Sequence, residues 1–487
     1  MPRRQMNQKI AVSVVFVAAM FMNIMDTTIV NVALPTIGKQ FHVAADSVDT
    51  VAIGYLVSLA VFIPVSGWLG DRLGPRRVLL SSVVVFTLAS ALCGLAQNLG
   101  QLVAFRVLQG VGGGLMVPVG MAMLFRIFPP EERVRASSIL IVPTALAPAL
   151  GPVLGGLFVT EVSWRWVFYV NLPIGVMALV FGLLFLASPK SERAGRLDVA
   201  GFLLSGAGLG LVMYGVSEGP FKGWGRPEIV VTLVAGALLL AGMVWVELRS
   251  GDPLIDLRLF RDSLFRTANI VMALGAVSFL GVLFIVALFF QDGLGQSALS
   301  SGLSTFPEAI GVMIGSQVVT RALYPNLGPR RTMFTGLLVL SLALALMSLV
   351  DTTGELWWMR GLMFFVGYGM AHVFTSAQAA GFATISGPDT ARASTVFNAL
   401  RQLGGAVGVA VLSTVVAEIG PVSRVGGRLV PHLTAYHATF LTAAAISLVA
   451  AGAALRVDDR AAAHTMVRRG ARPASARPAE EMAGSRA

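Results

Sequence analysis

The sequence is a series of apolar runs, each about as long as a lipid bilayer is thick, separated by short loops that carry most of the charge. Only 13% of the residues are charged, against about a quarter in an ordinary globular chain. A hydrocarbon core about 30 Å thick takes roughly 20 apolar residues per helix. We therefore predict an all-α membrane protein with fourteen spans, near residues 10-34, 48-69, 78-97, 101-125, 136-158, 165-187, 197-217, 228-249, 264-290, 302-323, 332-350, 355-382, 395-417 and 437-456.

Lys and Arg are unequally divided between the loops on the two sides. With both termini placed in the cytoplasm, most of them, such as Arg72, Arg76 and Arg77, fall in inner loops, and few, such as Lys39, fall outside. This is the bias of the positive-inside rule, and it predicts a multi-pass protein of the cytoplasmic (inner) cell membrane with both termini cytoplasmic. It also explains the net charge of +11. Charges spread over many short loops do not form the continuous basic face of a nucleic-acid-binding protein, so no nucleic acid partner is expected.

Several function classes lack their sequence signatures. Cys93 is the only cysteine and the five histidines are scattered, so neither a disulfide nor a metal site is expected. We find no nucleophile and base pattern and no Walker sequence, which argues against an enzyme and an ATP-driven pump. The first apolar run resembles a signal peptide, but it is longer than the apolar region of a signal peptide and Asp26 interrupts it. We therefore expect an uncleaved helix.

An internal repeat divides the chain. An offset of 254 places Leu73-Gly74-Pro75-Arg76-Arg77 on Leu327-Gly328-Pro329-Arg330-Arg331 and places Arg106 on Arg360. The matched spans are the second with the tenth and the fourth with the twelfth, so two helices are inserted between halves of six. We predict a six-helix bundle in 1-190, two inserted helices in 191-262, a second bundle in 263-456, and a disordered basic cytoplasmic tail in 457-487, where large apolar side chains are scarce. Two related six-helix bundles with a site near the midplane are the architecture of major facilitator transporters.

Four motifs strengthen that comparison. They are Met25 to Pro35 in the first span, Gly67 to Arg77 in the first inner loop, Arg106 to Gly114 in the fourth span and Gly151 to Gly156 in the fifth. Over about residues 10 to 455 the chain resembles the fourteen-helix drug:proton antiporter branch of the major facilitator superfamily, the QacA/EmrB type. The resemblance implies export of small amphipathic, often cationic compounds in exchange for protons, by alternating access, without a cofactor, and we expect a monomer in the lipid bilayer.

Asp26, Arg106 and Glu308 are the candidates for proton coupling. An acid within a span costs about 2.5 to 3.5 kcal/mol on insertion scales and is usually functional. Asp26 and Arg106 lie at similar depths, so they could pair, either for coupling or simply to satisfy two buried charges. Because an arginine stabilises the charged carboxylate, such a pair must loosen during the cycle, or another acid must carry the proton. We expect Glu308 to share that role, and the alternative places it at the outer membrane interface beside Pro307.

The loop at Gly67 is a candidate conformational latch. The turn residues Gly70, Gly74 and Pro75 surround Asp71, which can accept hydrogen bonds at a helix N-terminus. The resemblance implies that this loop holds the outward-facing state, with the start of the thirteenth span near Arg392 as its partner. The candidate latch residues are Gly67, Asp71, Arg72, Gly74, Arg76 and Arg77. Alternatively the arginines only set topology, and the copy at Leu327 has no acid, so any latch there is expected to be weaker.

Two further sets of residues have a functional and a packing interpretation. Gly151, Pro152, Gly155 and Gly156 remove side chains from one face of the fifth span, which suits close helix packing in any bundle; in the family this motif is associated with antiport. Polar residues within spans either line the substrate cavity or pack helices together: Asn31, His372, Gln378, Asn398, Arg401 and Gln402.

The predicted function is therefore proton-coupled multidrug export. A dedicated exporter of one endogenous metabolite, lipid or antibiotic keeps the same fold and is the first alternative. A membrane-embedded enzyme and a non-transporting receptor are the others, and uptake into vesicles under a pH gradient separates a receptor from a transporter.

Overall fold

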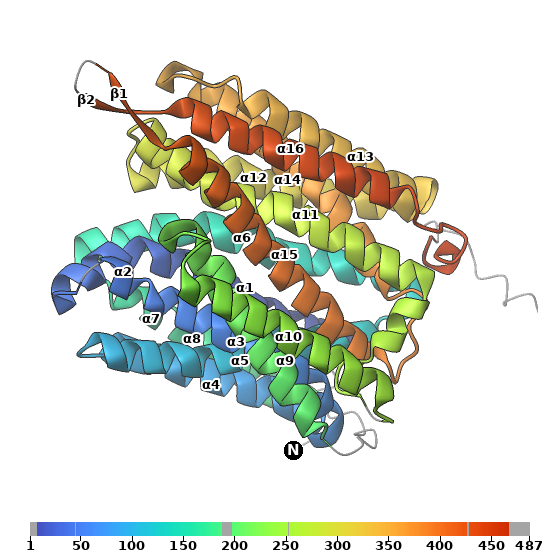
Figure 1. Cartoon of the computed structure of the whole chain (residues 1–487). Helices are drawn as coiled ribbons and strands as arrows, with labels where there is room; N and C mark the ends of the chain where they lie inside the picture. The colour runs from blue at the N-terminus through green and yellow to red at the C-terminus, as the bar shows by residue number, and fades with distance from the viewer. Residues whose placement is uncertain (1–6, 44, 188–196, 252, 426–427, 467–487) are drawn as a thin grey trace, which may run out of the picture.

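The computed structural model describes residues 7–43, 45–187, 197–251, 253–425 and 428–466. Long helices make up most of this part of the chain (Figure 1). They are α1 (Gln8–Phe41), α3 (Thr50–Leu73), α4 (Pro75–Leu95), α5 (Leu99–Ile127), α6 (Arg133–Leu157), α8 (Asn171–Phe185), α9 (Val199–Lys222), α10 (Pro227–Arg249), α11 (Ser263–Leu288), α12 (Ala298–Val318), α13 (Tyr324–Met347), α14 (Leu356–Gly381), α15 (Thr390–Ile419) and α16 (Leu433–Ala454).

Short elements join them. They include helices α2 (Ala45–Val48) and α7 (Trp166–Tyr169), the 3-10 turns η1 (Pro130–Glu132), η3 (Leu257–Arg261), η6 (Thr353–Glu355) and η7 (Ala463–Thr465), and the π-helical segments η2 (Phe158–Val162), η4 (Phe289–Gly293) and η5 (Val319–Leu323). Strands β1 (Val422–Val425) and β2 (Arg428–Pro431) form an antiparallel hairpin between α15 and α16, pairing Val422 with Pro431. The described residues contain no other strand.

Membrane-length apolar helices confirm the predicted fold class. In the described residues, 11 helices are long and apolar enough to cross a membrane, and one of them, Ser300–Met347, covers most of α12 and all of α13. Helix α14, which holds Arg360, His372 and Gln378, is not among the 11. The long helices can be matched with the fourteen predicted spans, which is consistent with that count without counting the crossings directly.

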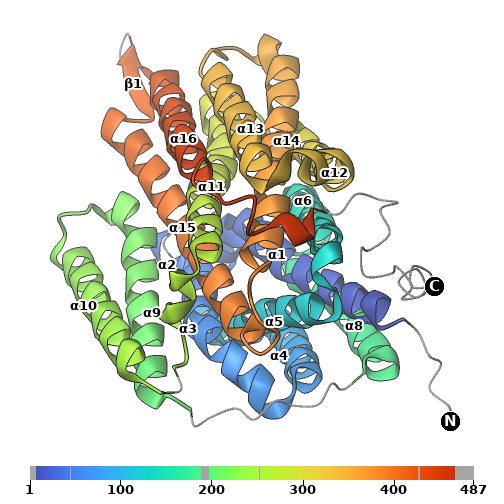
Figure 2. The ribbon, with the colours of Figure 1, turned by 90° about the vertical axis from the view of Figure 1, so that its right-hand side faces the viewer.

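The helices form two groups with an extra pair beside them. Figures 1 and 2 show α1 and α3 to α8, coloured blue to teal, in one group and α11 to α16, coloured yellow to red, in the other. Helices α9 and α10 pack on each other, and α9 also packs on α3 and α15. The two groups meet where α6 packs on α12 and α14 and where α15 packs on α3 and α5. The domain boundaries at 190 and 262 stay a prediction, and the first falls outside the described residues.

The duplicated loop has the same backbone turn in both copies. Gly74 has φ 89° and Gly328 has φ 77°, a left-handed conformation that glycine adopts without strain. A proline follows in each case, and its fixed φ suits the first turn of a helix. The matched arginines also contact matched helices. Arg106 Nε donates to Val51 O on α3 at 3.2 Å, and Arg360 Nε donates to Ser304 Oγ on α12 at 3.3 Å.

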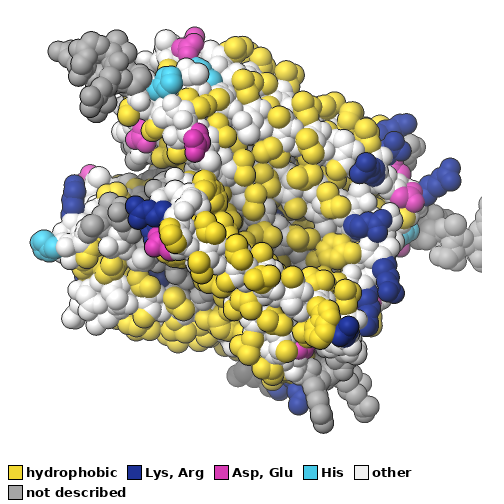
Figure 3. Space-filling model, viewed as in Figure 1, with side chains coloured by type: hydrophobic (Ala, Val, Ile, Leu, Met, Phe, Trp, Pro, Cys, Tyr) yellow, Lys and Arg dark blue, Asp and Glu magenta, His cyan; other side chains and the backbone are white. Residues whose placement is uncertain are grey.

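The surface has an apolar belt and one basic end. Figure 3 shows hydrophobic side chains over the middle of the molecule and most of the visible Lys and Arg at one end. We call this the basic end; it carries the loops at residues 72–77, 126–135, 253–266 and 321–331 (Figure 1). At the opposite end the face seen in Figure 3 is hollowed between the two helix groups.

The chain beyond α16 differs from the disordered tail predicted from residue 457. Val457, Ala462 and Thr465 are buried at the basic end, and η7 lies beside η1. The composition is poor in large apolar residues, but a few small side chains and polar contacts fix this stretch. Residues 467–487, the remainder of the predicted tail, lie outside the described residues.

Candidate functional site

A buried ion pair joins α1 and α5. Arg106 Nη1 donates to Asp26 Oδ2, and the two residues are 1% and 0% exposed. Arg106 Nε also donates to Val51 O on α3. The structure therefore brings together two of the three residues predicted for coupling and attaches them to a third helix.

Two amides that the sequence analysis missed complete this cluster. Gln109 Nε2 donates to Asp26 Oδ1 at 2.8 Å and to Ser90 Oγ at 2.7 Å, while its Oε1 accepts from Arg106 at 2.7 Å. Asn171 Nδ2 donates to Asp26 Oδ1 at 3.1 Å from the start of α8. Gln109 lies one turn after Arg106, so helical spacing could have found it. Asn171 had no such signal, because nothing in the sequence places α8 beside α1.

Aromatic rings cover the ion pair. The guanidinium carbon of Arg106 lies 4.3 Å from the centroid of the Tyr55 ring and 5.8 Å from that of Phe168. Tyr55 is fully buried and its hydroxyl accepts a hydrogen bond from Asn23 Nδ2 at 2.8 Å. Stacking of this kind stabilises a desolvated cation. In this conformation the pair is closed to water.

Glu308 is a second buried acid, in the other helix group. It is 3% exposed on α12, and within the described residues it makes no ion pair. Its backbone lies against α14, where a Cβ added to Gly367 would be 2.0 Å from Glu308 O. The bond from Arg360 to Ser304 lies one helical turn away. Glu308 is therefore buried within the protein; its depth relative to the outer membrane interface stays a prediction.

The Gly67 loop contacts the other helix group through a glycine. A Cβ on Gly67 would lie 2.9 Å from Thr395 Oγ1 and 3.3 Å from Ala391 O, both on α15. Beside it, Ser66 Oγ and Thr395 Oγ1 are 3.2 Å apart and share a hydrogen bond. The loop thus meets the start of α15, as the latch hypothesis requires, and a larger residue at position 67 would press on the Thr395 side chain and on the backbone at Ala391.

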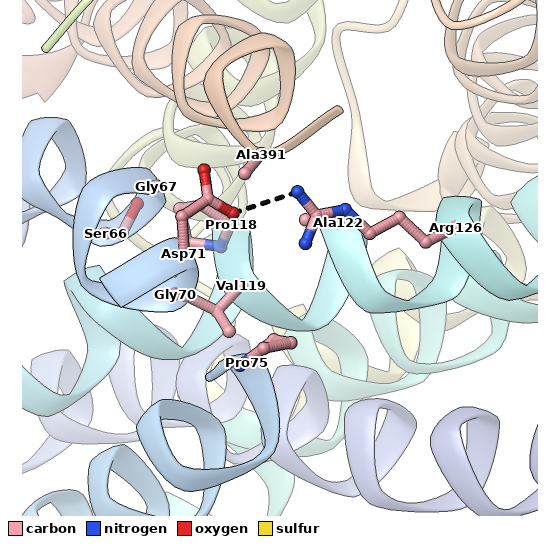
Figure 4. A pocket seen from close by; sticks show the side chains of 10 residues that line it. All are labelled: Ser66, Gly67, Gly70, Asp71, Pro75, Pro118, Val119, Ala122, Arg126 and Ala391. Carbon is pink, nitrogen blue, oxygen red and sulfur yellow. Dashed lines mark hydrogen bonds and ion pairs between the residues drawn. The ribbon is translucent and has the colours of Figure 1, made fainter. Parts of the chain in front are cut away.

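The charged contact of this loop differs from the predicted one. Asp71 forms an ion pair with Arg126 on α5 at 2.9 Å (Figure 4), and Arg126 Nε in turn donates to Gly387 O at 3.3 Å. Arg392, near which the partner was predicted, instead pairs with Asp256 at 3.7 Å. The acid therefore reaches the second group through an arginine. Sequence spacing could not show this, because Arg126 is 55 residues away on a helix of the same group.

The remaining latch candidates lie around the turn. Arg76 Nη2 donates to Leu183 O at 2.8 Å, within the first helix group, and Arg72 and Arg77 are exposed. Gly74 provides the left-handed turn. These residues shape and anchor the loop.

Further contacts close the basic end. The rings of Phe125 and Phe382 stack at 4.5 Å between centroids, with an interplanar angle of 8°. Arg133 Nη1 donates to Ala383 O at 3.0 Å. Because these contacts join the two groups at the basic end while the opposite end is hollowed (Figure 3), the cavity between the groups opens away from the basic end.

The glycines of α6 permit close packing on α1. A Cβ on Gly151 would lie 2.1 Å from Thr28 Oγ1, and one on Gly155 would lie 3.0 Å from Ile29 O. Gly156 faces away, with nothing within 4 Å among the described atoms. Pro152 lies inside the helix, and its side chain is outside the described part. Gly151 and Gly155 thus support the part of α1 that carries Asp26.

The predicted cavity residues lie in different surroundings. Asn398 is 2% exposed, its Nδ2 lies 3.3 Å from Met121 Sδ across the interface, and its Oδ1 has no partner among the described atoms. One turn further along α15, Arg401 and Gln402 are half-buried.

The other three candidates lie elsewhere. His372 packs against α13, where a Cβ on Gly336 would lie 2.3 Å from His372 Cβ. Gln378 is buried with Oε1 unpartnered among the described atoms, and Asn31 is exposed on α1. The structure therefore gathers Asn398, Arg401 and Gln402 on one helix, but it places His372 in a helix contact.

Comparison with known proteins gives one consistent family. The family model described as Major Facilitator Superfamily matches residues 16–409. A multidrug resistance protein B homolog of Mycobacterium tuberculosis is 32% identical over 405 residues, 82% of this chain and 74% of the relative. A tetracenomycin C resistance and export protein of Streptomyces glaucescens is 33% identical over 418 residues, 86% of this chain and 76% of the relative.

A solved structure shares the fold. The crystal structure of the human organic anion transporter MFSD10 (TETRAN) superposes with a TM-score of 0.65 at 18% identity, covering 92% of this chain and all of that one. Family and fold agree that this is a membrane transporter and not an enzyme. The chain belongs to the major facilitator superfamily.

Proposed function

We propose that the protein is a proton-coupled exporter of small amphipathic compounds, often cationic, in the cytoplasmic membrane. The observation that carries this proposal is the contrast between two buried acids: Asp26 is paired with Arg106, whereas Glu308 makes no ion pair in the described residues. A buried carboxyl group without a cation favours its protonated form, while a paired one favours its charged form. One conformation thus holds one buried acid with a cation partner and one without an ion pair in the described residues.

The cycle follows from where the two helix groups meet. We identify the basic end with the cytoplasmic side, which places both termini in the cytoplasm. In this conformation the latch contacts close that side, so Glu308 holds a proton taken from outside. When the groups rock and the cytoplasmic side opens, Glu308 meets water and releases the proton. Substrate enters there and is carried out on the return, with the proton gradient as the energy source and no cofactor.

The polar face of α15 is the best candidate for substrate contact. Asn398 touches Met121 of the opposite group, and Arg401 and Gln402 continue from it by one helical turn. A charge within a span is costly unless it faces a partner, water or a ligand. We therefore expect Arg401 to tune which substrate charges are accepted.

A dedicated exporter is the second candidate. One relative is named as a tetracenomycin C resistance and export protein, which supports export of a single antibiotic class. Relatives named for multidrug resistance support the broader specificity. Profiling an expressing strain and a deletion strain against dyes, drugs and lipids separates the two. We expect a monomer to be the working unit.

Proteoliposomes with an imposed pH gradient test the coupling. Asp26→Asn and Glu308→Gln are each expected to abolish gradient-driven transport, whereas Glu355→Gln, an exposed carboxyl in η6, should transport like the wild type. If both buried variants retain wild-type rates, the two acids are not the proton carriers. If the wild type shows no gradient-driven uptake of any compound in the panel, the exporter proposal itself fails.

A further inference from the structure

The second copy of the latch loop lacks the acid of the first copy, but an acid from elsewhere in the chain occupies its turn. Asp459 follows α16, and its Oδ1 accepts a hydrogen bond from Arg330 N at 2.9 Å. Its carboxylate lies directly over Gly328: a Cβ added there would be 2.8 Å from both Cγ and Oδ1 of Asp459. In the first copy, a Cβ on Gly74 would meet nothing within 4 Å among the described atoms.

The position of Asp459 is electrostatically favourable. After the turn at Gly328, the helical part of α13 starts at Pro329, so Arg330 N is one of the amides that the helix leaves without an internal partner. A carboxylate at such an end satisfies the amide and complements the partial positive charge of the helix dipole. Asp459 therefore anchors the stretch that follows α16 to the second helix group.

A second anchor fixes the same stretch a few residues later. The hydroxyl groups of Tyr324 and Thr465 share a hydrogen bond at 2.9 Å, and both residues are at most 2% exposed. His464 Nε2 lies 3.1 Å from Ala383 O, the carbonyl that also accepts from Arg133 of the first helix group. Residues 457–466 are thus attached to α13 at one side and reach the junction between the groups at the other.

The stretch also touches the first helix group. The η7 turn contacts η1, and Met466 packs against a small apolar cluster that unites both groups. This cluster is built from Val134, Val319, Tyr324, Leu323, Ala379 and Met466. When the groups separate at the basic end, these contacts with 130–134 must break.

We propose that residues 457–466 form a clasp that holds the basic end closed, with Asp459 as its positioning residue. Asp459 and Tyr324 attach the clasp to the second helix group. At its other end, η7 contacts η1 of the first helix group. Asp459 of the clasp thus provides an acid at the second loop copy, which has none of its own. It adds to the Asp71–Arg126 contact, so two separate devices favour the same conformation.

Distance measurement in lipid nanodiscs tests the clasp. Spin labels at Arg135→Cys and Arg331→Cys, both exposed and one on each group, report opening of the basic end in a Cys93→Ala background. Asp459→Asn should raise the ratio of open to closed molecules about twofold to fivefold, the range for losing a carboxylate at a helix end. Asp458→Asn is the matched control, because Asp458 is exposed and accepts only a local hydrogen bond from Arg460 N in the described residues.

Tyr324→Phe provides a second, milder perturbation that keeps the buried ring. It should shift the distances in the same direction. Unchanged distances in Asp459→Asn and Tyr324→Phe would overturn the clasp, as would an equal shift in Asp459→Asn and Asp458→Asn. Because the readout is a distance and not transport, the clasp can fail while the exporter proposal stands, and the reverse.

Discussion

The Asp26–Arg106 pair allows the structural and the coupling roles of a buried charge to be separated. In Asp26→Asn the amide oxygen can still accept hydrogen bonds from Gln109 and Asn171. The position of Oδ2, which accepts from Arg106, is then taken by an NH2 group, which donates hydrogen bonds and carries no negative charge. A charge-assisted hydrogen bond of about 1.5 to 3 kcal/mol is lost. Arg106, 1% exposed, is left as a buried charge without its counter-ion, which brings the expected loss to about 3 to 5 kcal/mol in free energy of unfolding.

The double variant Asp26→Asn/Arg106→Gln removes both charges and should recover most of that loss, leaving about 1 kcal/mol for the hydrogen bonds. Unfolding in mixed detergent micelles, followed by tryptophan fluorescence, measures both values, and Asp292→Asn at an exposed carboxyl is the control. Additive effects of the two single variants would refute the reasoning. A recovered fold without gradient-driven transport assigns the pair to coupling, whereas recovery of both assigns it to structure alone.

Two further variants test the latch and the glycine face. Asp71→Asn removes the partly buried ion pair with Arg126. Because such pairs stabilise a protein only modestly, the rate at which a thiol reagent modifies Ser66→Cys from the basic end should rise about threefold. An unchanged rate would contradict the latch. Gly151→Val forces α6 from α1 and should cost about 1 to 3 kcal/mol in thermal unfolding. Gly156→Val, with open space around it, should cost less than about 0.5 kcal/mol, and equal costs would disprove the packing argument.

Hydropathy and duplication were enough to predict the helices, because span length is set by the bilayer and the repeat by matching residues such as Gly74 and Gly328. Periodicity along one helix could also have added Gln109 to Arg106. These are local properties, and they can be read from a single stretch of sequence.

Contacts between distant segments could not be predicted in this way. Asn171 reaches Asp26 from 145 residues away, and Asp459 reaches Arg330 from 129 residues away. Both depend on how whole helices pack, which sequence spacing does not encode. The low apolar content after residue 457 led us to predict disorder. That prediction missed the order of residues 457–466, because the partners that hold this stretch belong to other helices.

The contact of Gly367 with the backbone at Glu308 has an evolutionary consequence. With a would-be Cβ only 2.0 Å from a carbonyl oxygen, no other amino acid fits at position 367 unless α12 and α14 move apart. Gly311 imposes the same restriction on this helix pair, 2.0 Å from Phe364 O. Variants selected for new substrates should therefore leave these two positions unchanged, and they should accumulate on helices whose side chains are free to change size, such as the half-buried stretch of α15 around Arg401.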